Sequence, residues 1–160
     1  AADPLQEIRR LTEHGFLTPQ QGEAIDPARV RRLFSSSLYA RMERSDRLLR
    51  EVHFTIDVPA ARLLPSSEEQ AWASGDSLII QGIADCVFEE DGRLIVVDYK
   101  TDRVKTGEEL VGRYREQLQI YADALARTLS LPVEEALLYS FVLGRTVDAT
   151  AILREGGSPG

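Results

Sequence analysis

The chain has 160 residues, 43% of them hydrophobic and 28% charged, with a formal net charge of −7. This composition fits one globular domain and excludes a disordered chain. The sequence has no run of about 18 apolar residues, the length that a membrane-spanning helix needs. The start AADPLQEIRR lacks a signal-peptide pattern, so we expect a cytoplasmic protein without membrane contact. The single cysteine, Cys86, excludes a disulfide framework and a multi-cysteine metal cluster.

The acidic charge argues weakly against a domain that grips nucleic acid by itself, because such affinity usually comes from basic patches. It does not exclude a catalytic domain that receives nucleic acid from a partner. The chain begins as if already inside a helix, and its end, REGGSPG, is typical of a frayed tail. We therefore expect a single domain over 1–160, with a tail at 154–160, that is a fragment of a larger protein.

Helices are predicted first along the chain. Apolar spacing indicates an amphipathic helix over 4–14 and a short helix over 18–25. A third helix is predicted over 26–45, with Asp26 as the N-cap and Pro27 at the first helical position.

Strands follow in the middle of the chain. They are predicted over residues 48–59, 77–89 and 93–100, with a polar connection at 60–76. Helix 107–129 comes next, and 135–153 is predicted to form one or two further strands. This order predicts an α/β fold with a mixed central sheet flanked by helices.

The hairpin of strands 77–89 and 93–100 contains one aspartate in each apolar run, Asp85 and Asp98. A two-residue Asp-Gly turn at 91–92 predicts that the two carboxylates lie directly opposite each other on one face, with Cβ atoms about 5 Å apart. Lys100, two residues after Asp98, projects from that face as well. The same residues would allow a simpler interpretation, in which each aspartate is an ordinary turn or edge residue.

Opposed like charges destabilise a sheet, so something must offset them. A divalent cation such as Mg²⁺ is the natural choice, because hard cations bind carboxylate oxygens. Lys100 would then stand beside the ion, where it could orient water or stabilise charge that develops on a phosphate. Geometry alone leaves the metal site and the simpler interpretation open.

The segment QGIADCVFEEDGRLIVVDYKTD, residues 81–102, resembles the Asp…Asp-x-Lys motif of the PD-(D/E)XK nuclease superfamily. It is similar in detail to the nuclease domain of AddA, the helicase–nuclease component of bacterial AddAB complexes, and of its relative RecB. Residues 114–121 match a Tyr-x-x-Gln-Leu-x-x-Tyr helix pattern, and REVHF at 50–54 is similar to an Arg-Glu-x-Pro-Phe segment. The resemblance covers roughly residues 14–147 and implies the restriction-endonuclease-like fold.

The resemblance implies roles for the hairpin residues. Asp85 and Asp98 would be metal ligands, with the backbone carbonyl of Tyr99 as a third oxygen ligand for Mg²⁺ or Mn²⁺. Lys100 would be the catalytic lysine.

The resemblance also implies roles on the helix. Gln117 and Tyr121 would support the site or contact DNA, whereas Tyr114 and Leu118 are expected to be core residues. Glu51 is expected to be either a further acidic member of the site or a strand-edge residue paired with an arginine.

One part of the family pattern is missing. An upstream helix with a metal-binding histidine has no match, and we expect structural roles for His14 and His53. The simplest interpretation is that the chain begins after that helix, which leaves the metal without one ligand and puts full activity of the isolated fragment in doubt. The iron–sulfur cysteines of some related nucleases are also absent from the sequence.

The resemblance therefore implies a Mg²⁺-dependent DNA exonuclease that acts on a single strand fed by the ATP-dependent helicase motor of the same polypeptide. It further implies a role in double-strand break repair and recombination, together with an AddB-type partner. A docking domain without catalysis and a Cas4-like exonuclease are the alternatives. Four basic residues would form a rim around the site or simply be solvated charges: Arg103, Lys105, Arg113 and Arg115.

Overall fold

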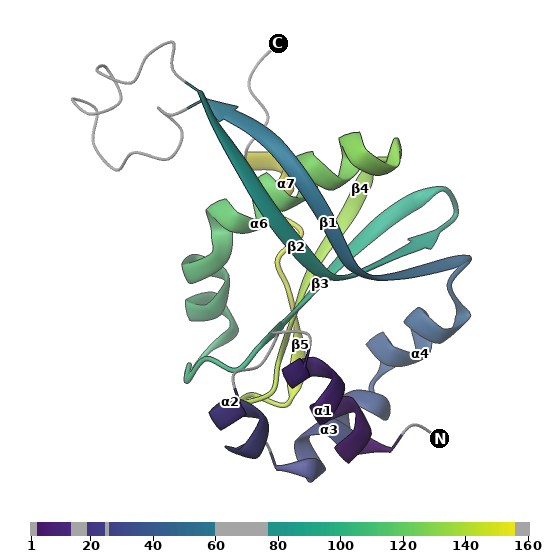
Figure 1. Cartoon of the computed structure of the whole chain (residues 1–160), viewed down its shortest axis with the longest axis vertical. Coiled ribbons are helices and arrows are strands. Elements are labelled where there is room, and N and C mark those ends of the chain that lie inside the picture. The colour runs from purple at the N-terminus through teal and green to yellow at the C-terminus, as the bar shows by residue number, and fades with distance from the viewer. Residues whose placement is uncertain (1–2, 14–18, 25, 60–76, 156–160) are drawn as a thin grey trace, which may run out of the picture.

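The central element is a five-stranded mixed sheet (Figure 1). The computed structural model describes residues 3–13, 19–24, 26–59 and 77–155. In sheet order, which is also chain order, the strands are β1 (Arg47–Pro59), β2 (Ser77–Glu90), β3 (Arg93–Lys100), β4 (Val133–Ser140) and β5 (Arg145–Asp148). Strands β3 and β4 are parallel and the other neighbours are antiparallel. The predicted α/β class is confirmed.

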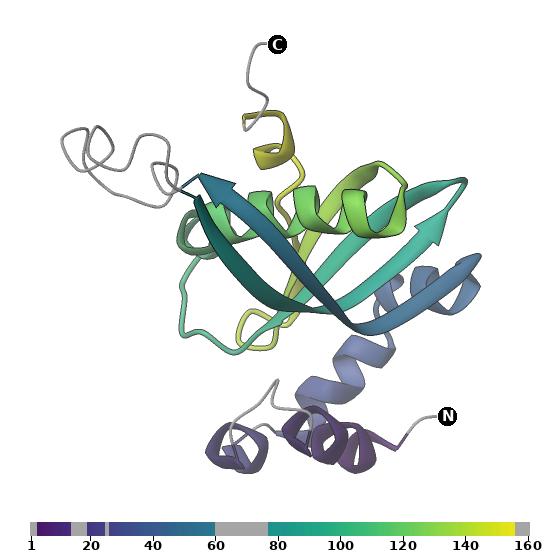
Figure 2. The ribbon, with the colours of Figure 1, turned by 45° about the horizontal axis from the view of Figure 1, so that its top comes forward.

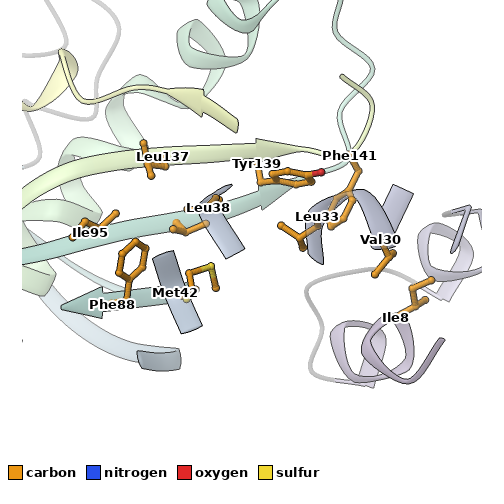
Figure 3. Close-up of a cluster of buried hydrophobic side chains, with 12 residues drawn as sticks. Ile8, Val30, Leu33, Leu38, Met42, Phe88, Ile95, Leu137, Tyr139 and Phe141 are labelled. Carbon is orange, nitrogen blue, oxygen red and sulfur yellow. The ribbon is translucent and has the colours of Figure 1, made fainter. Parts of the chain in front are cut away.

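Helices cover both faces of this sheet (Figure 2). The crossover helix α6 (Gly107–Leu129) packs on one face, against Val87 and Val96 among others. The opposite face is covered from the N-terminal region, where Ile8, Val30 and Met42 meet strand residues in a second cluster (Figure 3). The described helices of that region are α1 (Pro4–Glu13), α2 (Pro19–Ala24), α3 (Pro27–Phe34) and α4 (Ser37–Arg44). None of the helices in the described residues is long and apolar enough to cross a membrane.

The predicted single helix over 26–45 is wrong, because the chain forms two helices there. Asp26 caps α3 as predicted, and its side chain accepts a hydrogen bond from the Ala28 N–H at 2.9 Å. Ser35 ends α3, and Ser36 takes an extended backbone conformation and accepts from the Tyr39 N–H at 3.1 Å, which starts α4. The cap at Ser36 therefore starts a second helix where the apolar spacing had predicted that the first one continues.

The C-terminal prediction also needs correction. Strand structure ends at Asp148, whose side chain accepts from the Thr150 N–H at 2.9 Å and turns the chain. The chain then forms the short helix α7 (Ile152–Glu155) instead of a continued strand. The predicted tail from residue 154 therefore begins with the end of α7, and 156–160 lie outside the described residues.

The predicted hairpin register is confirmed. Asp91 and Gly92 both have positive φ, 51° and 74°, as a type I′ turn requires. The ladder pairs Glu90 with Arg93 and continues to Cys86 with Val97. The next step along both strands reaches the two aspartates.

Strand β1 changes face at Glu51, whose φ is +54°. Leu48 packs on the cluster that faces α1, α3 and α4, whereas Val52, four residues later, packs on the cluster that faces α6. In a regular strand two residues of the same parity would share a face. The left-handed residue therefore turns the rest of β1 toward α6, and this brings Phe54 to the helix.

Candidate active site on the central hairpin

Two buried carboxyl groups meet where β2 and β3 continue beyond their last ladder pair. Asp85 is 9% exposed and Asp98 6%. Their carboxyl groups hydrogen-bond to each other, and the Tyr99 N–H donates to Asp85 Oδ2 at 2.8 Å. The structure therefore brings these two predicted site residues together.

Burial raises the pKa of Asp85 to about 9, and the hydrogen bond and charge of Asp98 add to this effect. The Tyr99 N–H and the Lys100 ammonium act in the opposite direction but more weakly. At neutral pH the metal-free pair therefore retains a proton and carries one negative charge, because burial and mutual repulsion oppose ionisation of both carboxyl groups more strongly than Lys100 favours it.

Lys100 lies on the same face of β3 as Asp98. Its Nζ lies 2.7 Å from Asp98 Oδ2, and its side chain is only 12% exposed. The Tyr114 ring of α6 covers the ammonium, with the ring centroid 3.6 Å from Nζ. The Tyr114 hydroxyl donates to both carboxylate oxygens of Asp102, each at 2.9 Å.

The contact between Tyr114 and Lys100 does not follow from the sequence prediction, which places Tyr114 in the core. The residue does pack beside the cluster that contains Leu118, but its ring also contacts Lys100. A tyrosine one helical turn before Gln117, on the same stripe of the helix, is the available signal in the sequence.

Helix α6 also carries Gln117 and Tyr121, the two helix residues that were predicted to support the site. Their side chains hydrogen-bond to each other. Burial raises the pKa of Tyr121, and the charges of Asp98 and Asp85 act in the same direction. Phe54 of β1 packs edge-on against Tyr121, with ring centroids 4.8 Å apart.

Glu51 of β1 contacts the N-terminal region. Its Oε1 lies 4.0 Å from an Arg10 nitrogen of α1, which agrees with the alternative of an arginine partner. Within the described ranges, no group of three or more His, Cys, Asp or Glu side chains is placed to hold a metal ion. His53 is exposed on β1, and His14 lies outside the described residues.

The four basic residues of the predicted rim differ in their contacts. Arg113 pairs with Asp102 at 3.3 Å and with Glu109 at 3.0 Å. Arg115 pairs with Glu155, and Arg103 and Lys105 are exposed. The interpretation as solvated surface charges therefore fits Arg113 and Arg115 at least as well as a rim.

The acid pair fits the chemistry of a divalent cation. It supplies two adjacent carboxyl groups, and oxygen ligands of this kind are those that Mg²⁺ and Mn²⁺ prefer. Burial and the neighbouring Asp98 raise the pKa of Asp85, and a bound cation would favour the ionised form of both carboxyl groups instead.

The chain is similar in sequence to known subunits of helicase–nucleases. The chain is 40% identical over 141 residues to the A subunit of an ATP-dependent helicase/nuclease from Acetivibrio thermocellus, and 37% identical over 139 residues to its counterpart from Clostridium botulinum. Each match covers 87% of this chain but only 11% of the relative, so the chain spans about a tenth of their length.

A solved structure named "Crystal structure of SSO0001" overlaps at a TM-score of 0.44 with 20% identity, over 95% of this chain and 68% of that one, which is too low to add to the assignment. The family profile of the PD-(D/E)XK nuclease superfamily, by contrast, matches residues 2–156. Nucleases of this superfamily generally use divalent metal ions, as the acid pair suggests. The chain belongs to the PD-(D/E)XK nuclease superfamily.

Proposed function

We propose that this chain is the nuclease domain of an AddA-type helicase–nuclease and that it hydrolyses DNA phosphodiester bonds with Mg²⁺. The observation that carries the proposal is the buried Asp85–Asp98 pair with the Lys100 ammonium 2.7 Å from Asp98, in a chain of this superfamily. The name of its relatives, each the A subunit of an ATP-dependent helicase/nuclease, supports the type of parent protein.

Each site residue has a role in this proposal. Asp85, Asp98 and the Tyr99 carbonyl would hold the ion, which supplies Lewis-acid activation of water and phosphate when it is bound. Lys100 places a positive charge next to the pair, where it stabilises the negative charge that develops on the scissile phosphate. Gln117 and Tyr121, linked to each other, would support the acid pair or the DNA strand that approaches it.

The proposal extends to the whole protein. The domain would act in the cytoplasm as an exonuclease on a single strand that the helicase part of the same polypeptide delivers, with an AddB-type partner, during double-strand break repair and recombination. The net charge of −7 is compatible with this arrangement, because the motor would supply most of the grip on the DNA backbone.

Cleavage assays on the complete helicase–nuclease with its partner test the function. End-labelled linear and circular single strands with Mg²⁺ distinguish exonuclease from endonuclease cutting. Asp98→Ala and Lys100→Ala should abolish cutting while ATP-driven unwinding persists. The matched controls Asp57→Ala, an exposed aspartate on β1, and Arg29→Ala, an exposed basic residue on α3, should cut as the parent does.

Two results would contradict the proposal. Persistent Mg²⁺-dependent cutting by either site variant would remove the assignment of the residues. Absence of cutting in the parent complex, with partner association intact, would instead favour a docking domain without catalysis.

A further inference from the structure

We propose that Tyr114 and Asp102 are a positioning pair that fixes the Lys100 ammonium beside the acid pair. The proposal rests on the proposed nuclease function for its kinetic consequence, but its structural part can be tested without any activity. Neither residue would contact the reacting atoms.

Lys100 requires such a device because its side chain is long and flexible. A lysine ammonium is a point charge on a four-carbon stem, and a single ion pair leaves it several accessible rotamers. The Asp98 carboxylate holds Nζ from one direction at 2.7 Å, and the Tyr114 ring holds it from another at 3.6 Å. Both contacts occur at a side chain that is only 12% exposed, where cation–π attraction is stronger than at an open surface.

Asp102 fixes the ring in turn. It follows β3 by two residues, and its two oxygens both accept from the Tyr114 hydroxyl at 2.9 Å. Arg113, adjacent to Tyr114 on α6, donates to the same carboxylate at 3.3 Å. These hydrogen bonds join the segment that follows β3 to α6, and they hold the Tyr114 ring against Lys100 Nζ.

The chemistry of the pair favours the arrangement. Burial, followed by the hydrogen bond to Asp102, raises the pKa of Tyr114 to about 12, so the phenol keeps the proton that it donates. The negative charge of Asp102 at the hydroxyl also increases the electron density of the ring face that meets the ammonium. Loss of Tyr114 would leave Lys100 with the Asp98 contact and no ring, whereas loss of Asp102 would leave the ring in place without its hydroxyl anchor.

Nuclear magnetic resonance of lysine-labelled protein tests the contact directly. The sequence contains two lysines, Lys100 and Lys105, so ¹³C-lysine labelling gives two sets of signals, and the exposed Lys105 is an internal reference. The Lys100 εCH₂ signals should be displaced upfield by the ring current and should move to the Lys105 position in Tyr114→Leu. Tyr114→Phe keeps the ring, and Asp102→Ala releases the hydroxyl, so both should give an intermediate displacement.

Single-turnover cleavage by the complete helicase–nuclease tests the consequence. Tyr114→Leu and Asp102→Ala should lower the cleavage rate by roughly ten- to a hundred-fold, as expected for a displaced catalytic group, without a change in DNA affinity. Asp102→Asn keeps a hydrogen-bond acceptor and should restore much of the rate. Glu116→Gln, at an exposed position of α6, should have no effect.

The outcomes separate this proposal from the nuclease assignment. Lys100 signals that are unchanged in Tyr114→Leu, or a cleavage rate unchanged despite altered signals, would overturn the positioning role. A parent that does not cut DNA but shows the displaced Lys100 signals would refute the nuclease function and leave the contact established as structural only, which also ends the positioning role.

Discussion

Replacement of Asp85 by asparagine should stabilise the metal-free protein at neutral pH. The pKa of Asp85 is raised from 3.8 to about 9 in the fold, so the folded protein binds a proton that the unfolded chain releases over this range. Its contribution to stability is therefore fully present below about pH 4 and is lost as the pH rises toward 9. Asparagine keeps an oxygen that can accept from the Tyr99 N–H and carries no titratable charge.

The magnitude follows from the same shift. Each pH unit above the ordinary pKa of 3.8 costs the parent about 1.4 kcal/mol of folding free energy. At pH 7 the Asp85→Asn variant can therefore be more stable than the parent by at most about 4 kcal/mol. At pH 4 the two proteins should have nearly equal free energies of unfolding. Asp98→Asn should gain less than Asp85→Asn, because it gives up the 2.7 Å ion pair with Lys100.

Urea unfolding in chelator between pH 4 and 9 measures this difference, and Asp57→Asn, on the exposed side of β1, is the matched control. With Mn²⁺ at a hundred times the dissociation constant of the parent, binding stabilises the parent by about 2.7 kcal/mol and the gap should shrink accordingly. A variant less stable than the parent in chelator at pH 7, or a gap that does not change with pH, would refute the reasoning. Asp85 would then be a charged acceptor that stabilises the fold.

Two further predictions concern the metal and the support of the site. Because the described residues bring only two carboxylates together, calorimetry on this chain should show weak Mg²⁺ and Mn²⁺ binding, and a micromolar dissociation constant would show that another residue supplies a ligand. Gly82→Ala should destabilise the protein by about 1–3 kcal/mol through overpacking, because an added Cβ would lie 2.4 Å from Phe54 Cζ. Denaturant unfolding measures this loss of stability. Since Phe54 packs on Tyr121, the cleavage rate of the complete protein should fall as well. An unchanged stability would mean that the Phe54 ring moves aside freely.

The sequence alone determined the centre of this protein, because local rules decide it. Asp-Gly favours the type I′ turn, which has two positive φ values, and a two-residue loop allows one register, so the approach of Asp85 and Asp98 followed from counting residues. The alternation of side chains then placed Lys100 with Asp98. The Asp26 cap and the helix over 107–129 were likewise determined by neighbours in the chain.

Only the tertiary structure decided the rest. The division of the predicted helix 26–45 depends on how α3 and α4 pack against the sheet, since serine is tolerated within helices as well as at their caps. The left-handed Glu51, its proximity to Arg10, and the contact of Tyr114 with Lys100 join elements that are far apart in sequence. The charge state of Asp85 depends on burial, and burial exists only once α6 covers the hairpin.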